Sequence, residues 1–262
     1  MAPITVDGLD VDDVTIDGDV VDEITMDGDV VYQASAIPDS VVDNFEDADG
    51  DPLGVYETGE TLADYYTLNE GNGSIARTTS NVIEGGHALG RDGSPSGDRI
   101  TAWSVPGDGL NRYLDEGDKI GVLLRSGLGS LRPGLLFNVE EGASPGAYGA
   151  VIDEGNNEIK IVRIADISPS DWSSDFTELA VENVTIADNT WYWCEVQTPS
   201  TGDNTIELSV YDADTNGDLS RGSSVGTVST TDSTHISEPG VGIFYFARAD
   251  SETSHDWIRV ID

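Results

Sequence analysis

The sequence predicts an all-β protein, an antiparallel two-sheet sandwich or jelly roll that follows a small N-terminal module of β-repeats. Short segments rich in β-branched and aromatic residues recur from residue 41 to the C-terminus, with turn residues between them. No segment of helical length shows the 3.6-residue period of an amphipathic helix. Many short strands at this spacing are typical of sandwiches and jelly rolls.

The segment Thr190–Gln197 is the strand around which we expect the rest to pack, because it holds three aromatic residues and the only cysteine. Alternation places Trp193 and Glu195 on one face and Tyr192 and Cys194 on the other. Two largely apolar faces suit a strand inside a sandwich. Cys194 is interpreted as a core residue, and a single cysteine excludes an internal disulfide and a cysteine-based zinc site.

About fourteen strands are expected after residue 41, and a turn over 154–157 joins two of them. One helical turn is expected over 168–175. The strands are Asp64–Leu68, Ser74–Thr79, His87–Leu89, Arg99–Ser104, Lys119–Arg125, Gly134–Val139, Ala147–Asp153, Glu158–Ile167, Ala180–Ile186, Thr190–Gln197, Thr205–Tyr211, Ser224–Thr230, Val241–Ala247 and Trp257–Ile261.

The N-terminal module is a repeat with a period of ten, seen in Ile4–Gly8, Val14–Gly18 and Ile24–Gly28. Each unit is a short β-branched run followed by Asp-Gly, a strong hairpin signal. Three such units are too small to bury a core of their own. We therefore expect residues 1–36 to dock on another protein or to drive oligomerisation, with residues 37–262 forming the main domain. The alternative is a hairpin extension that completes the main domain.

The charge is strongly acidic: 50 Asp and Glu residues face 12 Lys and Arg residues, a formal net charge of −38. High salt screens this repulsion, so the composition indicates a halophilic protein. The acidic residues alternate with apolar ones, which argues against a disordered acidic tail, and the shortage of basic residues argues against nucleic-acid binding. The N-terminus shows no signal peptide and no apolar run is long enough to span a membrane, so we expect neither export nor membrane insertion.

Several segments in order resemble the concanavalin A-like (LamG-type) jelly-roll superfamily of lectins and glucanases, over residues 41–262. The resemblance implies that the first and last strands pair near the middle of one sheet, which would place Asp43-Asn44-Phe45 beside Trp257-Ile258-Arg259. The segments that carry it are Asp43–Asp47, Glu84–Leu89, Asn189–Tyr192, Ile206–Ala213, Val241–Phe244 and Asp256–Val260.

The Asp-Gly repeats resemble the N-terminal segments of tail and fibre proteins of haloarchaeal tailed viruses. This implies a virion structural protein, in a tail fibre, baseplate or capsid appendage, that binds other virion proteins through residues 1–36 and forms a homo-oligomer such as a trimer. Its jelly roll would bind a host-surface glycan or S-layer glycoprotein outside the cell. The alternatives are a host cell-surface or secreted carbohydrate-binding module, or an architectural jelly roll without a ligand.

Structural Ca²⁺ is the one cofactor that the sequence indicates. Asp212–Asp218 has an oxygen ligand at every second position before and after a glycine, as calcium loops do, although Ser223 stands where a bidentate Glu is expected. Asp47–Asp51 is a second candidate, and the predicted end-strand pairing adds a third. The candidate ligands are Asp43, Asp47, Asp49, Asp51, Asp212, Asp214, Asn216, Asp218 and Asp256. The alternative is an aspartate-rich loop that forms by chance in an acidic protein.

Catalysis is not expected. The sequence lacks the Glu-x-Asp-x-Glu strand of the superfamily's glucanases, and its acidic cluster at Asp115–Asp118 is turn-like. A glycan site should instead combine aromatic rings with short polar side chains. The candidates are the aromatic residues Trp103, Tyr113, Tyr148 and Trp172 and the polar residues Asn111, Asp153 and Asn156. Each could equally be an ordinary packing or surface residue.

Overall fold

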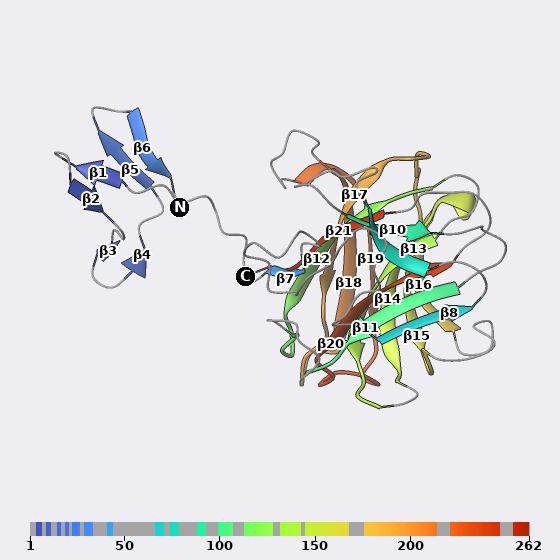
Figure 1. Ribbon diagram of the computed structural model, residues 1–262. Coiled ribbons are helices and arrows are strands. Elements are labelled where there is room, and N and C mark those ends of the chain that lie inside the picture. Colours follow the sequence, from blue (N-terminus) through green and yellow to red (C-terminus); the bar gives the residue numbers. More distant parts are fainter. Residues whose placement is uncertain are drawn as a thin grey trace. The chain divides into compact units, whose positions relative to one another are not determined.

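The computed structural model describes the backbone of the strands given below. It describes side chains mainly over residues 101–106, 113–127, 132–142, 145–167, 176–213, 221–244 and 255–261 except 257. The chain divides into two compact units, Met1–Asp39 and Ser40–Asp262. Figure 1 labels the strands of both, and each unit is described by itself. Within the described residues no helix is long and apolar enough to cross a membrane.

The first unit contains three two-stranded hairpins, one for each repeat. Their strands are β1 (Ile4–Val6) with β2 (Leu9–Val11), β3 (Thr15–Ile16) with β4 (Asp19–Val20), and β5 (Glu23–Met26) with β6 (Asp29–Gln33). Val6 opposes Leu9, Ile16 opposes Asp19 and Met26 opposes Asp29, so the residues between the strands are Asp-Gly in every repeat. The hairpin prediction is therefore confirmed, and the docking role of this unit stays a prediction.

The second unit is a sandwich of two antiparallel sheets, which confirms the predicted fold class (Figure 1). The eight-stranded sheet has the order β19 (Arg221–Thr231), β18 (Thr205–Ala213), β17 (Trp191–Gln197), β12 (Lys119–Arg125), β21 (Ser254–Ile261), β10 (Ala88–Asp92), β9 (Ser74–Thr78), with β7 (Val41–Asp43) also on β21. The seven-stranded sheet has the order β16 (Phe176–Asn183), β15 (Glu158–Ile164), β14 (Ala147–Asp153), β13 (Arg132–Val139), β20 (Gly240–Phe246), β11 (Arg99–Ser104), β8 (Tyr66–Glu70).

The first and last strands of the sandwich pair, as predicted. Asp43 of β7 opposes Ile258 of β21, and β21 lies between β12 on one side and β7 and β10 on the other. A jelly roll brings distant parts of the chain together in this way, because the chain crosses repeatedly between the two sheets. The remainder of the predicted Asp43–Asp47 match lies outside the described residues.

The core lies between the sheets, and β17 contributes to it as predicted. Tyr192 and Cys194 face the other sheet in the main apolar cluster, whereas Trp193 and Glu195 are buried on the opposite face. Burial raises the pKa of the Cys194 thiol, which keeps it protonated. His255 of β21 contacts the carbonyl oxygen of Gly134 in β13 through Nε2 at 3.0 Å, so a buried hydrogen bond also joins the two sheets.

Three predicted strands, β11, β12 and β14, have the expected bounds. In β12 and β14 a continuous run of apolar and glycine residues stops at a charged residue, Arg125 and Asp153. The strand predicted to reach Ile167 ends at Ile164. Ile167 lies in the loop that follows, where its side chain is buried and its backbone N–H donates to the carbonyl oxygen of Pro145. Strand β16 begins at Phe176 instead of Ala180. The turn over 154–157 is confirmed as a single 3-10 turn, whereas the turn expected over 168–175 lies outside the described residues.

Candidate functional site

The predicted ligand-binding aromatic residues do not form one surface. Tyr148 is fully buried and Trp103 is 8% exposed, so the expectation that their rings are accessible is wrong. The reason is that the alternation of β14 turns Tyr148 into the main core, while Trp103 packs in a second apolar cluster on the outer face of the seven-stranded sheet. Tyr113 is half-buried at the edge of the core, and Trp172 lies outside the described residues.

Two of the predicted polar ligands, Asp153 and Asn156, lie together at one turn. Asp153 is buried and forms ion pairs with Arg132 at 2.9 Å and Lys160 at 3.3 Å. Asn156 is exposed in the turn that follows, and its side-chain amide donates to Asp153. Asn111 lies outside the described residues. Asp153 therefore stabilises a turn and an ion-pair network, and the binding role of the predicted set stays a prediction.

The calcium prediction concerns residues that the structure describes only in part. Asp212 is exposed on β18, Asp256 is buried on β21, and Asp43 is described by its backbone alone. Asp47, Asp49, Asp51, Asp214, Asn216 and Asp218 lie outside the described residues. Across the part of the chain that the structure describes, no three His, Cys, Asp or Glu side chains form a group that could hold a metal ion.

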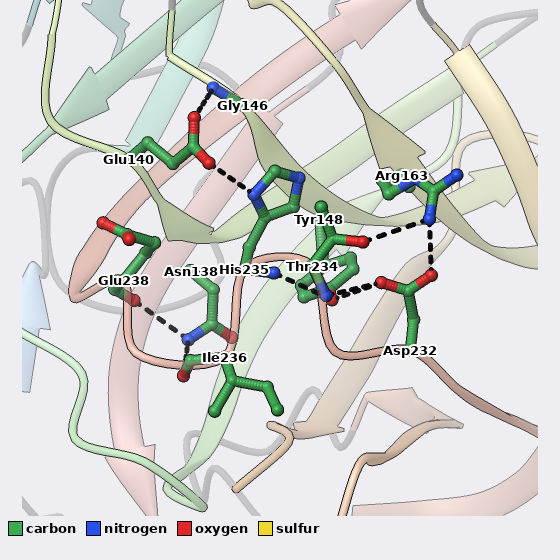
Figure 2. Close-up of polar contacts among 10 residues, drawn as sticks. All are labelled: Asn138, Glu140, Gly146, Tyr148, Arg163, Asp232, Thr234, His235, Ile236 and Glu238. Atoms are coloured by element: carbon green, nitrogen blue, oxygen red, sulfur yellow. Dashed lines mark hydrogen bonds and ion pairs between the residues drawn. The ribbon is translucent and has the colours of Figure 1, made fainter. Parts of the chain in front are cut away.

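A hydrogen-bonded surface lies at one end of the sandwich, where segments 113–118, 140–142, 198–204 and 232–239 meet. We call it the loop end. Its centre is Tyr148, whose hydroxyl donates to Asp232 at 2.7 Å and accepts the backbone N–H of His235 at 3.1 Å (Figure 2). Asp232 also binds Arg163 at 2.7 Å. A core tyrosine thus fixes the loop between β19 and β20.

Two further contacts hold the same loop. Nδ1 of His235 lies 2.9 Å from Glu140, whose other oxygen accepts the backbone N–H of Gly146 (Figure 2). The side-chain amide of Asn138 donates to the carbonyl oxygens of Ile236 and Glu238. These contacts come from β13 and the segment after it, so the seven-stranded sheet positions the loop.

Glu116 joins three segments of the loop end at its surface. One carboxylate oxygen accepts the Ser237 hydroxyl at 2.5 Å, and the other accepts the backbone N–H of Thr201 at 2.9 Å. Gly117, in a left-handed conformation with φ of 81°, donates its N–H to Pro199. A positive φ is readily adopted by glycine, which explains the turn at this position. The result is an ordered surface of carboxylates and hydroxyls.

The electrostatics keep these groups in complementary protonation states. Burial, followed by the hydrogen bond to Asp232, raises the pKa of Tyr148, which therefore remains a donor. Burial raises the pKa of Asp232, but hydrogen bonds from Tyr148 and Thr234 and the charge of Arg163 outweigh it and lower the pKa overall. Hydrogen bonds from Ser237 and then Thr201 lower the pKa of the exposed Glu116. Both carboxylates are acceptors at neutral pH.

A second charged surface is the outer face of the eight-stranded sheet. Gly121 of β12 leaves room for the indole of Trp193, because a Cβ at this position would overlap the ring. The guanidinium of Arg259 lies 4.4 Å from the centre of that ring, within cation–π range. The indole N–H donates to Glu195 at 2.7 Å. An aromatic ring and a buried carboxylate are therefore fixed on this face.

Sequence reasoning missed most residues of both surfaces. It interpreted Asp115–Asp118 as a turn-like acidic cluster. The sequence carries no spacing signal for the loop end, because Glu116 and Ser237 are 121 residues apart and Glu140 and His235 are 95 residues apart. The one available signal was Glu195, a carboxylate in an otherwise apolar strand.

No protein-family model matches the chain, and neither does any curated protein. Among solved structures, the carbohydrate-binding module CBM66 from Bacillus subtilis aligns with 12% identity and a TM-score of 0.48, over 79% of this chain and 98% of the module. Arcelin-5, a lectin-like defence protein from Phaseolus vulgaris, aligns with 11% identity and a TM-score of 0.42, over 75% and 97%. Lectin II from Ulex europaeus aligns with 8% identity and a TM-score of 0.43, over 79% and 96%.

Proposed function

We propose that the chain is a virion structural protein of a virus of halophilic hosts, and that its sandwich attaches to a host-surface glycan through the loop end. The observation that carries the binding part is Glu116, which is exposed and fixed between the Ser237 hydroxyl and the Thr201 N–H. Fixed carboxylates and hydroxyls suit the hydroxyl groups of sugars, since an ordered site loses little conformational entropy on binding. The glycan is bound and not cleaved.

The virion role is supported by the repeat and the charge. Three hairpins with Asp-Gly connections bury too little surface to form a core alone, so a partner surface would stabilise them. The net charge of −38 suits a particle that works in high salt. In this proposal residues 1–36 bind other virion proteins or further copies of the chain, and residues 37–262 face the host.

Binding of the full-length chain to haloarchaeal envelope preparations and to a glycan array, in molar NaCl, tests the attachment role. Glu116→Ala is expected to weaken binding about tenfold or more, because it removes an acceptor and the link between three segments. Glu182→Ala, which removes an equal charge from an exposed position on β16, is the matched control. Unchanged binding by Glu116→Ala, or no binding by the parent chain, contradicts the proposal.

Deletion of residues 1–36 tests the assembly role. The shortened chain is expected to fold in high salt and to keep its glycan binding, while losing self-association or binding to virion partners. Light scattering and circular dichroism in molar NaCl measure the two properties. If the shortened chain unfolds, the hairpins complete the sandwich and the assembly role fails.

A further inference from the structure

The outer face of the eight-stranded sheet holds two cations above one carboxylate. Glu195 of β17 is 3% exposed, and it forms ion pairs with Nε of Arg221 and with Nζ of Lys119 at 3.7 Å. The two cations remain accessible, with side-chain exposures of 49% for Arg221 and 37% for Lys119. Counting these three groups, the cluster has a local charge of +1 on a chain whose net charge is −38.

The geometry leaves the outer donors of Arg221 available. Its Nε contacts Glu195, and its guanidinium carbon lies 5.5 Å from the centre of the Tyr211 ring. The two terminal nitrogens of a guanidinium form the fork that binds a carboxylate or sulfate in a bidentate manner. Glu195 therefore anchors the guanidinium at one edge, and the half-buried Tyr211 supports it from the side.

Among the described residues, the side chains next to the cluster are mostly polar and uncharged. Ser209 and Thr227, on neighbouring strands in the row that contains Glu195, bond through their hydroxyls at 3.0 Å. Glu207 is exposed on the same face, but Gln197 separates it from Lys119 in the strand register. Hydroxyl groups beside a guanidinium and an aromatic ring provide partners for a sugar that carries an acidic group.

We propose that Arg221 and Lys119, with Tyr211 and the hydroxyls of Ser209 and Thr227, bind the carboxylate or sulfate group of an anionic glycan. The proposal builds on the attachment function, and it names the chemical class of the glycan and a second contact surface for it. Glu195 carries a single negative charge, which one cation would neutralise. The second cation therefore leaves an excess positive charge at this site. Bidentate hydrogen bonds also keep this contact specific in high salt, where long-range attraction is screened.

The experiment measures binding of the full-length chain to three oligosaccharide probes in molar NaCl. Oligogalacturonate supplies carboxylates, dextran sulfate supplies sulfates, and dextran is the neutral probe. The parent chain is expected to bind at least one acidic probe about tenfold more tightly than dextran, which corresponds to one charge-assisted hydrogen-bonded contact. The preferred acidic probe distinguishes a carboxylate from a sulfate ligand.

Variants locate the contact. Arg221→Gln is expected to remove most of the preference for the acidic probe, while Arg221→Lys, which keeps the charge but loses the fork, retains part of it. Arg91→Gln, on β10 of the same sheet, changes the net charge equally and should leave the preference unchanged. If Arg91→Gln and Arg221→Gln reduce the preference for the acidic probe equally, the proposed site is wrong, because the preference would then depend only on the net charge of the protein.

Glu195→Gln separates a binding role from a structural one. If the cations bind a ligand, removal of the competing carboxylate raises the affinity for the acidic probe several-fold, even if the protein becomes less stable. If the cluster only stabilises the sheet, the variant lowers stability and leaves the affinity unchanged, which overturns the proposal. Preserved envelope binding with no acidic preference would reject this inference alone, whereas loss of all glycan binding by the parent chain would reject the attachment function as well.

Discussion

The loop end and the outer face of the eight-stranded sheet belong to the same sandwich but are held by different forces. At the loop end, Tyr148, His235 and Asn138 fix backbone segments through hydrogen bonds. On the outer face, a glycine makes room for an indole, and ion pairs surround one buried carboxylate. The difference shows that one fold can present a network of hydrogen bonds at its end and a cationic cluster on its face.

The largest expected effect comes from salt, which acts on both surfaces through the whole chain. Below about 0.5 M salt, where the Debye length grows beyond roughly 4 Å, repulsion among the acidic residues should expand or unfold the protein. The melting temperature, followed by circular dichroism from molar to millimolar NaCl, measures this. An unchanged melting temperature would show that the acidic residues do not set the stability.

The next largest effect is expected on the outer face. Trp193→Ala should lower the free energy of unfolding by about 3–5 kcal/mol, because it leaves a cavity above Gly121 and removes a donor from Glu195. Denaturant titration in high salt measures the change. The control is Tyr211→Phe, which keeps the aromatic ring on the neighbouring strand. It should change the free energy of unfolding by no more than about 0.5 kcal/mol. A loss below about 1 kcal/mol would mean that the indole contributes little packing.

A smaller effect is expected at the loop end. Tyr148→Phe keeps the buried ring but removes the hydroxyl that binds Asp232 and the N–H of His235, so the free energy of unfolding should fall by about 1–3 kcal/mol. Hydrogen exchange should accelerate in residues 232–239 before it changes elsewhere. If exchange rises equally in the whole sandwich, Tyr148 stabilises the core and does not specifically fix the loop.

The smallest effect is a shift in the pH dependence of stability. The pKa of Asp232 is lowered in the folded chain, so its contribution is present above the unfolded value near 3.8 and is lost as the pH falls through the folded value. Tyr148→Phe removes one cause of the lowered pKa and so moves the folded pKa of Asp232 toward its unfolded value. The contribution of Asp232 should therefore be smaller, and its loss should be complete at a higher pH. Burial lowers the pKa of His255 from 6.5 to about 3, and its contribution is lost between these values in both proteins. The difference between the two denaturation profiles thus isolates Asp232, and coincident profiles below pH 4 would contradict the assignment.

The features that the sequence predicted are local ones. Strands β12 and β14 have their expected bounds because a short apolar run that stops at a charged residue is typical of a buried strand. The hairpins of the first unit follow from Asp-Gly turns in the same way. The resemblance also predicted the pairing of β7 with β21, which no local pattern contains.

The candidate sites could not be predicted, because they depend on long-range register. Lys119 reaches Glu195 only because β12 and β17 pair with Lys119 opposite Gln197, which turns Lys119 and Glu195 toward the same face. Tyr148 was proposed as a ligand-binding aromatic residue. Its burial follows from the position of β14 between β13 and β15, and nothing in the adjacent residues signals that position.

The pairing of β7 with β21 also has a consequence for biosynthesis. β21 lies between β12 and the pair β7 and β10, so the eight-stranded sheet stays divided until β21 has been synthesised. Such late, non-local pairing slows folding and leaves strand edges open to other nascent chains. A premature stop before residue 254 would expose the whole edge of β12, and the sandwich of such a fragment could not close. The eight residues of β21 are thus required before the two halves of the eight-stranded sheet can join.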